Sequence, residues 1–345
     1  MEGYPHVVAG AHRVTRSLLA ALPAHGWEGV VVLPADGPAA EGFAAAGTEV
    51  RVVEAPPALR RYEGTSRPGA AATALPTHWR RVARALDGVD VVHALDPRGL
   101  LLGGPAARLA RRPLVWQLHT TSRWGAVNRL GRALAGEVCV MSASSRAAMP
   151  GLGRRATVAA PPVADGLRAL APAAPGPRPV VATIARPHPE KGLDVLVAAL
   201  ALLPPEVTLR VVGAGTGSGL ERHDRVEVVP WADDPVAAVA DAWAYVQPSR
   251  SESWGLALAE ARAAGLAVVA TDVPGLREQV ADGVDGLLVP SEDPVALAAA
   301  IARLLDDRGL ATRLGAAARA ATLAGPTEAD HAAAWAARYA ALAPA

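Results

Sequence analysis

The sequence is poor in cysteine, in aromatic residues and in long apolar runs, and each scarcity excludes something. Its single cysteine, Cys139, rules out an internal disulfide, and its place in the apolar run EVCVM predicts a buried, inert thiol. Aromatic residues make up 4% of the chain, so valine, leucine and alanine must fill the core. No apolar run reaches the roughly 18 residues of a membrane span, and the first residues lack the order of a signal peptide. We therefore expect a cytoplasmic protein.

The composition that is present suits a protein of two domains. The chain has 345 residues, of which 51% are hydrophobic and 19% charged. Its net charge of +1 conceals an asymmetry, because residues 1–165 carry +7 and residues 166–345 carry −6. A basic N-terminal half predicts an anionic acceptor or the inner face of a membrane as its partner, with an arginine-rich solvated surface as the alternative. No nucleic-acid-binding motif accompanies the charge, so we expect no nucleic acid partner.

Lysine is scarcer still: Lys191 is the only lysine among 34 basic residues. It stands with Arg186 in a proline-rich turn between an expected buried strand, residues 180–184, and an expected helix, residues 193–203. A compact ammonium and a planar guanidinium beside a helix N-terminus can bind a diphosphate. The alternative is that both are ordinary surface charges.

The stretch from Ser249 to Gly265 organises the rest of the chain. It follows an expected strand, residues 242–247, and turns into a helix after a Trp-Gly pair. The order strand, tight turn, helix presents free backbone N–H groups and a positive helix end to a ligand. Two carboxylates, Glu252 and Glu260, bracket this turn.

The string E-S-W-G-L-A-L-A-E, from Glu252 to Glu260, resembles the E-x7-E motif of the retaining glycosyltransferases of family 4. Matching segments continue through residues 271–278 and 283–290. The resemblance implies the α/β GT-B fold, in which two Rossmann-like domains face a cleft and a C-terminal helix crosses back to the N-terminal domain. It covers most of the chain and is closest over residues 180–290.

The same resemblance implies roles for the residues of the site. Arg186 and Lys191 would hold the nucleotide diphosphate, Glu252 would bind hydroxyls of the donor sugar, and Glu260 would bind those of the ribose. His119 would lie near the sugar ring. The other expected donor-binding positions are Gly10, Gly213, Trp231, Ser253, Trp254, Gly255 and Leu256.

Two of these donor-binding positions lie in loops that follow strands of the second half. Gly213 opens the glycine-rich loop GAGTGSG after the expected strand at residues 207–212. This loop fails the dinucleotide-binding spacing because Ser218 stands where the third glycine should be. We interpret it as a loop that contacts the nucleotide, and Trp231 as part of the base-binding loop or as a packing residue.

Two histidines end expected strands in the first half. The expected strand at residues 89–94 ends at His93, and the expected strand at residues 114–119 ends at His119. Ligands bind beyond the carboxyl ends of parallel strands, so we expect both histidines to lie at the sheet edge where a ligand binds. His119 matches the family better, and a packing or capping role is the alternative for each.

The start of the chain departs from the pattern of an alternating α/β domain. A strand should precede the expected helix at residues 10–25, but residues 1–9 read as a loop. The loop that begins at Gly10 also lacks one glycine and the Glu of the family. Either the natural start lies upstream of Met1 or the domain lacks its first strand, and we favour the former.

We predict four segments. Residues 1–165 form the acceptor-side domain, residues 166–178 a Pro/Ala-rich linker, residues 179–326 the nucleotide-sugar-binding domain, and residues 327–345 the crossover helix. Within the first domain, residues 56–76 read as a surface segment without regular structure.

The reaction that follows is transfer of a sugar from a nucleotide diphosphate sugar, with retention at the anomeric carbon. We expect no metal ion, because cationic side chains take its place and the His and Asp residues do not cluster at ligand spacing. We expect no cofactor, since the nucleotide sugar is a substrate. The alternatives are an inactive partner subunit, a two-domain sugar-binding protein and a nucleotide-sugar epimerase. The identities of the nucleotide, the sugar and the acceptor stay open.

Overall fold

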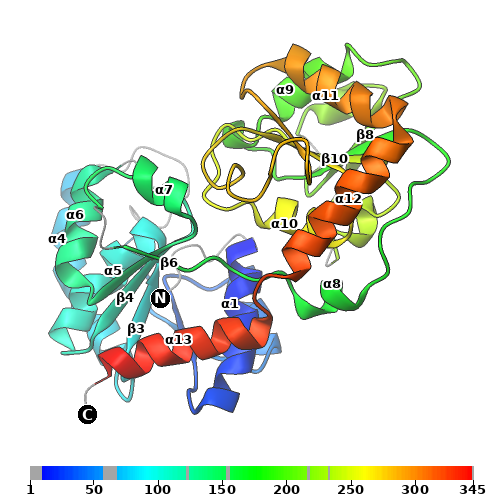
Figure 1. Cartoon of the computed structure of the whole chain (residues 1–345). Helices are drawn as coiled ribbons and strands as arrows, with labels where there is room; N and C mark the ends of the chain where they lie inside the picture. The colour runs from blue at the N-terminus through cyan, green and yellow to red at the C-terminus, as the bar shows by residue number, and fades with distance from the viewer. Residues whose placement is uncertain are drawn as a thin grey trace. The chain divides into compact units, whose positions relative to one another are not determined.

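The structure is a computed structural model that describes residues 10–56, 68–121, 124–152, 156–215, 218–231 and 234–343, with residues 68–72 described by their backbone alone. The chain divides into two compact units (Figure 1). Unit 1 comprises residues 1–161 and 328–345, and unit 2 comprises residues 162–327. The stretch predicted as a linker, residues 166–178, belongs to unit 2.

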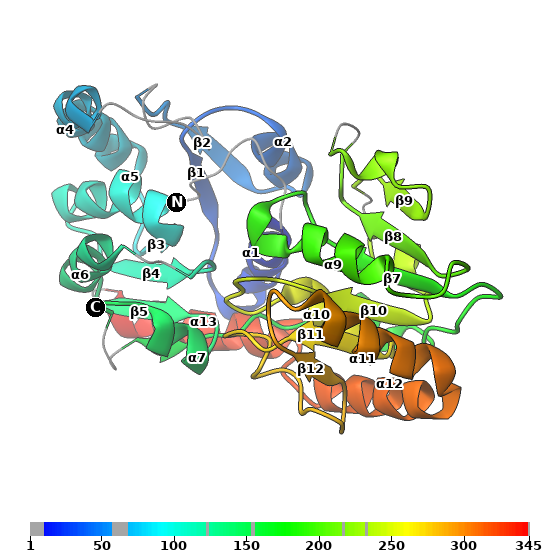
Figure 2. The ribbon, with the colours of Figure 1, turned by 90° about the horizontal axis from the view of Figure 1, so that it is seen from above.

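Unit 2 is built on a parallel sheet of six strands in the order β12-β11-β10-β7-β8-β9 (Figure 2). The strands are β7 (Val180–Ile184), β8 (Thr208–Val212), β9 (Val226–Val229), β10 (Ala244–Gln247), β11 (Val268–Thr271) and β12 (Leu287–Val289). The helices are α8 (Asp165–Ala169), α9 (Leu193–Leu200), α10 (Leu256–Ala263), α11 (Pro294–Asp306) and α12 (Arg308–Leu323). Short 3-10 turns complete the unit: η2 (Pro189–Lys191), η3 (Leu220–Arg222) and η4 (Ala237–Val239).

Both faces of this sheet are covered. Val181 of β7 packs in one apolar cluster with residues of α9 and α11, whereas Ala182 packs in a second cluster with residues of α8 and α10. Strands buried on both faces read as continuous apolar runs. That is why the sequence predicted β7, which is buried at every position, with its observed bounds. The edge strand β9 was also predicted with its observed bounds, although its Glu227 is exposed.

Unit 1 contains a four-stranded parallel sheet, in the order β3-β4-β5-β6, and a separate parallel pair, β1-β2. The strands are β1 (Val30–Leu33), β2 (Glu49–Val52), β3 (Val92–Leu95), β4 (Leu114–Leu118), β5 (Glu137–Val140) and β6 (Thr157–Val158). The helical elements are α1 (Gly10–Ala21), η1 (Leu22–His25), α2 (Pro38–Ala45), α4 (Pro68–Ala85), α5 (Asp96–Leu109), α6 (Gly125–Leu134), α7 (Ala143–Ala148) and α13 (Glu328–Leu342).

The C-terminal helix α13 belongs to unit 1, as the GT-B resemblance implies. Its Trp335 and Tyr339 pack in one cluster with Leu18 of α1, Val115 of β4 and Cys139 of β5. Cys139 is fully buried, and burial raises the pKa of its thiol to about 11. This confirms the prediction of a buried thiol, which stays protonated at neutral pH.

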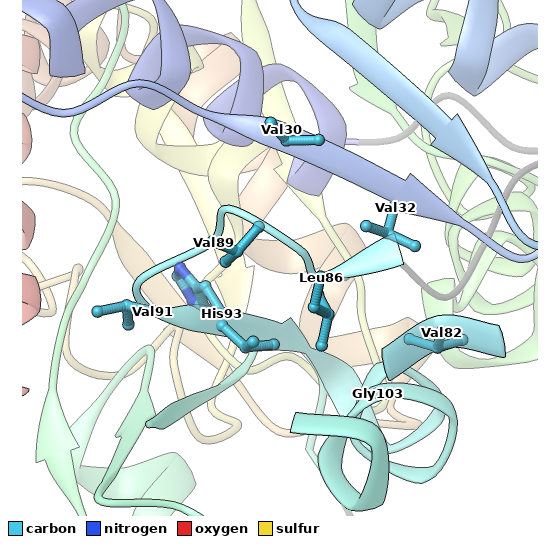
Figure 3. Close-up of a pocket in the computed structure, with 9 residues that line it drawn as sticks. Val30, Val32, Val82, Leu86, Val89, Val91, His93 and Gly103 are labelled. Carbon is cyan, nitrogen blue, oxygen red and sulfur yellow. The ribbon is translucent and has the colours of Figure 1, made fainter. Parts of the chain in front are cut away.

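A cavity of about 40 Å³, lined by apolar side chains and by His93, lies between β1 and β3 (Figure 3). Within the described ranges these two strands do not pair with each other. The cavity is lined by Val30, Val32, Val82, Leu86, Val89, Val91, Val92, His93 and Gly103. The sequence predicted that residues 1–9 form a loop and that the strand expected before α1 is missing. Residues 1–9 lie outside the described residues.

One prediction about unit 1 is wrong. Residues 68–76 were expected to lack regular structure, but they form the first half of α4, while residues 57–67 lie outside the described part of the chain. Helix α4 packs against α5, and the indole of Trp79 donates a hydrogen bond to the carbonyl of Leu101 at 2.9 Å. Proline is tolerated at the first position of a helix, where Pro68 stands, and the alanines that follow favour a helix, so the prolines did not exclude one here.

Candidate functional site

Strands β7 and β10 mark the point where the strand order of unit 2 reverses. From β7 the chain proceeds in one direction to β8 and β9, and later in the other direction to β10, β11 and β12. In open parallel sheets, ligands bind beyond the carboxyl ends of the strands at such a point. The turn after β7 carries Arg186 and Lys191, and the loop after β10 carries Glu252. The topology therefore brings the predicted cations and the predicted carboxylate to one sheet edge.

A glycine allows these two segments to approach each other closely. Gly192 follows η2 with a φ of 63°, in the left-handed region. A Cβ atom at this position would lie 2.1 Å from the carbonyl oxygen of Pro248, the residue directly after β10. Only glycine fits such a contact without displacing backbone, so Gly192 fixes the turn of Lys191 against the loop of Glu252.

Lys191 and Glu252 form an ion pair at this edge. The ammonium Nζ lies 2.9 Å from both carboxylate oxygens, and the two side chains are 25% and 14% exposed. An ammonium has three donors, so one remains for a further acceptor. The sequence predicted both residues for the site, and the structure brings them into direct contact.

Arg186 is a second cation on the same turn. Its side chain is half-buried, and in the described parts of the chain it forms no ion pair or hydrogen bond. A guanidinium that has no carboxylate partner keeps its donors for an anion.

The loop that leads into α10 is held by residues from the segment after β11. Gly255 caps the helix with a φ of 90°, and a Cβ there would lie 2.5 Å from Leu276 Cδ2. The side-chain amide of Gln279 donates to the carbonyls of Trp254 and Gly255. These contacts fix the carbonyls of the loop, while the first N–H groups of α10, beginning at Leu256, have no acceptor within the helix.

Ser253 and Glu260 are buried in this arrangement, at 8% and 4% exposure. A Cβ atom on Gly275 would lie 2.6 Å from the carbonyl carbon of Ser253, so the loop after β11 covers the loop after β10. Burial raises the pKa of Tyr245, and the charges of Glu260 and Glu252 add to the effect. Helix α10, which carries Glu260, packs against β10, and the predicted role of Glu260 toward ribose stays a prediction.

A chain of buried polar groups ties β10 to the root of the same loop. The hydroxyl of Tyr245 donates to Gln247 Oε1 at 2.8 Å, and Gln247 Nε2 donates to Ser249 Oγ at 2.9 Å. The hydroxyl of Thr271 donates to the carbonyl of Ser249 at 2.5 Å. All of these side chains are buried, so their hydrogen bonds hold the first residues of the loop after β10 in place.

Gly213 and Trp231 lie together at the ends of β8 and β9. Gly213 has a φ of 93°, and a Cβ there would meet Trp231 Cε3 at 3.1 Å. The indole is 38% exposed, so one part of its surface packs on the glycine and another faces solvent. Residues 216–217 and 232–233, which flank this pair in the sequence, lie outside the described residues.

In unit 1, His119 follows β4 at the carboxyl edge of the four-stranded sheet. Its backbone N–H donates to Asp96 Oδ1 at 3.0 Å, as do the N–H and the hydroxyl of Thr120. Burial lowers the pKa of His119, and the charge of Asp96 opposes this. The imidazole is therefore neutral at pH 7.

The structure assigns His93 to packing. Its Nδ1 lies 2.8 Å from the hydroxyl of Tyr339, and its ring stacks on Trp335 with centroids 4.5 Å apart. Of the two alternatives for His93, the packing role is thus the one observed. Gly10, the other candidate in unit 1, is the first residue of α1, and its expected contact with the donor stays a prediction.

Sequence reasoning missed three residues that shape these two edges: Asp96, Arg250 and Gln279. Asp96 is buried and adopts a φ of 60°, which is rare for a residue other than glycine. Arg250 binds two carboxylates that lie 56 and 42 residues away in the sequence. Only Asp96 left a signal, because it directly follows a buried strand.

The comparisons with known proteins agree with this geometry. A model of glycosyl transferases group 1 matches residues 178–307, and a model of the glycosyl transferase 4-like domain matches residues 9–161. Together the two models cover most of the chain.

Among curated proteins, the chain is 33% identical over 254 residues to a phosphatidyl-myo-inositol mannosyltransferase of Mycolicibacterium smegmatis, which covers 67% of this chain and 65% of the relative. It is 45% identical over 148 residues to a D-inositol 3-phosphate glycosyltransferase of Xylanimonas cellulosilytica, which covers 38% of this chain and 35% of the relative. The match thus spans about a third of the length of the latter protein.

Among solved structures, HepE of Anabaena in complex with UDP and glucose superposes with a TM-score of 0.81, at 22% identity and over 99% of this chain and 98% of that one. Sucrose-phosphate synthase from Thermosynechococcus elongatus superposes with a TM-score of 0.79, at 23% identity and over 99% of this chain and 96% of that one. The described helices include none that is both long and apolar enough to cross a membrane. The chain belongs to glycosyltransferase family 4 and has the GT-B fold.

Proposed function

We propose that this chain transfers a sugar from a nucleotide diphosphate sugar to an acceptor, with retention of the anomeric configuration. The observation that carries the proposal is the edge of unit 2, where Lys191 pairs with Glu252 beside Arg186, a cation that forms no ion pair with any described residue. Breaking the bond between sugar and phosphate leaves negative charge on the diphosphate. The two cations and the first N–H groups of α10 would stabilise that charge, because they are positioned before the reaction begins.

The carboxylates and the histidine would position the donor. By the family resemblance, Glu252 would bind hydroxyls of the sugar and Glu260 those of the ribose. Because the pKa of His119 is lowered, its imidazole would serve as a neutral hydrogen-bonding group toward the sugar ring. No cofactor enters this scheme, since the nucleotide sugar is a substrate.

We further propose that the reaction needs no metal ion. Divalent ions assist phosphate leaving groups by neutralising charge, and Arg186 and Lys191 supply two positive charges at the diphosphate site. Within the described residues, no group of His, Cys, Asp and Glu side chains is arranged to hold a metal ion. Activity that is unchanged by a chelator would support this proposal, and activity that requires added Mg²⁺ would contradict it.

For the acceptor we propose an inositol that carries a phosphate group. The support is the names of the two relatives and the charge of unit 1, whose α4 exposes Arg80, Arg81 and Arg84. Helix α6 adds exposed Arg129 and Arg132, next to Trp124 and Leu130, which are 63% and 37% exposed. Exposed cations beside apolar side chains also suit peripheral contact with an anionic membrane on its cytoplasmic side. Soluble inositol 3-phosphate and phosphatidylinositol vesicles, offered as separate acceptors, would distinguish the two sources.

The donor site is tested by thermal unfolding of the protein with UDP, GDP or ADP. A ligand of the native state raises the melting temperature by mass action, by about 2.7 kcal/mol of stability at a hundredfold excess over Kd. One nucleotide should raise it, and Lys191→Ala should lose this response and about 10²- to 10³-fold in kcat/KM. Arg210→Gln, which removes a paired arginine elsewhere in unit 2, is the matched control and should respond as the wild type does. No response to any of the three nucleotides would overturn the proposal.

A further inference from the structure

We propose that Arg250 is a positioning residue that fixes the distance between Lys191 and Glu252. Arg250 lies in the loop after β10, two residues before Glu252, and it reaches across to the turn that carries Lys191. Its importance for catalysis rests on the function proposed above. Its effect on the Lys191–Glu252 pair does not, so the two can be tested apart.

The contacts of Arg250 bracket Lys191 on both sides. Before Lys191, the backbone N–H of Arg250 donates to the carbonyl of Glu190 at 2.8 Å, and Nη1 donates to the carbonyl of Pro189 at 2.6 Å. After Lys191, the guanidinium binds both carboxylate oxygens of Asp194, in the first turn of α9, at 2.8 and 2.7 Å. The segment 189–194 is therefore attached to Arg250 at both of its ends.

A third segment completes the set of contacts. Nε and Nη2 of Arg250 bind the two carboxylate oxygens of Glu292, which follows β12. Glu292 itself adopts a φ of 64°, a conformation that costs energy for a residue other than glycine. The planar guanidinium thus joins three segments that each leave the same sheet, and all of its donor nitrogens are engaged.

This arrangement differs from an ordinary surface ion pair. Exposed pairs contribute little to stability, and Asp194 and Glu292 are 70% and 58% exposed. A fork with two bidentate partners nevertheless fixes direction as well as distance. We therefore expect the loss of Arg250 to change the geometry of the Lys191 turn more than the stability of unit 2.

The single lysine of the chain gives a direct measurement of this geometry. Protein labelled with ¹³C- and ¹⁵N-lysine has one lysine side-chain signal, that of Lys191. Glu252→Gln sets the position of the signal when the ion pair is lost. Arg250→Gln should move the wild-type signal toward that position, and Arg210→Gln should leave it in place. Arg210 is the matched control because it also binds two carboxylates, those of Glu227 and Asp241, away from Lys191. A wild-type signal in Arg250→Gln would overturn the proposal.

Kinetics with the donor provide the second measurement. A displacement of about 1 Å in a positioned group can cost on the order of 10²-fold. We expect kcat/KM of Arg250→Gln to fall by about 10- to 100-fold at an unchanged melting temperature, with partial recovery in Arg250→Lys. An equal loss in Arg210→Gln would contradict a positioning role. If the wild type transfers no sugar from any donor, the proposed function fails, while the signal of Lys191 still decides the role of Arg250.

Discussion

At the carboxyl edge of the unit 2 sheet, Lys191 and Glu252 pair at 2.9 Å, and Arg250 binds Asp194 and Glu292 beside them. At the corresponding edge of the unit 1 sheet, a single carboxylate, Asp96, accepts hydrogen bonds from two backbone N–H groups and one hydroxyl. The indole of Trp116 donates a further hydrogen bond to the backbone carbonyl of Asp96 at 3.0 Å. One edge is held together by opposite charges, and the other by neutral donors around one buried acid.

The difference indicates which chemistry each edge suits. In unit 2 the cationic side chains already carry their positive charge before a ligand binds. They can therefore stabilise the negative charge of a phosphate leaving group. In unit 1, burial lowers the pKa values of His93, His119 and His331, so these side chains are neutral at pH 7. Neutral groups can hydrogen-bond to a sugar without attracting the diphosphate. The first two predictions test the neutral edge and the third tests the charged edge.

The largest effect should follow the loss of Asp96. Asp96→Ala removes the acceptor of three donors and places alanine at a φ of 60°. An unpaired buried donor costs about 1–3 kcal/mol and a left-handed alanine about 1–2 kcal/mol, so we expect a destabilisation of about 4 kcal/mol. Hydrogen exchange should show faster exchange in β4 and no change in β7 and β10.

Asp96→Asn is the matched control for this loss. Asparagine tolerates the left-handed conformation and keeps a carbonyl acceptor, so it should cost about 1 kcal/mol. If Asp96→Ala leaves the exchange of β4 unchanged, the unit 1 edge is not organised by this carboxylate.

The second prediction concerns pH. Burial, with a contribution from His119, lowers the pKa of His331 to about 4, and its Nε2 accepts a hydrogen bond from Trp335 at 2.9 Å. In the unfolded state His331 binds its proton near pH 6.5, whereas in the folded state it does so only near pH 4. The stability that comes from the neutral imidazole is therefore fully present above pH 6.5 and is lost as the pH falls toward 4. This loss amounts to about 3 kcal/mol. His331→Gln keeps an acceptor for Trp335 and should remove that part of the pH dependence.

Urea unfolding at pH 7.5 and pH 4 measures the pH effect as a difference between variants. His25→Gln is the matched control, because His25 is exposed and should leave the difference unchanged. A wild-type pH dependence in His331→Gln would show that folding does not hold His331 in its neutral form.

Much of this fold could be predicted from the sequence where both faces of a strand are buried. Strand β7, which is buried at all five positions, was predicted with its observed bounds, because fully covered parallel strands appear as uninterrupted apolar runs. Helix α5 was not predicted. Its sequence DPRGLLLGGPAARL contains three glycines and an internal proline, which disfavour a helix, yet the helix is buried between neighbours that stabilise it. Local propensity could not reveal that packing.

The site could be predicted in its residue types but not in its internal contacts. The turn with Lys191 and the loop with Glu252 were recognised because each has a local pattern next to a strand. Their direct contact, and the three segments that Arg250 joins, depend on which strands are neighbours in the sheet. Sequence separations of 56 and 42 residues leave no local signal for such pairs.

The smallest effect should follow a change of Trp231. It tests whether, at the charged edge, the indole binds the nucleotide base while the cations bind the diphosphate. If the exposed part of the indole stacks on the nucleotide base, Trp231→Ala should weaken nucleoside diphosphate binding by about 1 kcal/mol, or roughly fivefold, and Trp231→Phe by less. Calorimetric titration with the nucleotide and with inorganic pyrophosphate separates the two contributions. Pyrophosphate should bind the wild type and both variants equally, because its charge is met by Arg186 and Lys191 and not by the ring. An equal loss for both ligands would mean that Trp231 supports the loop after β9 and leaves the base to other residues.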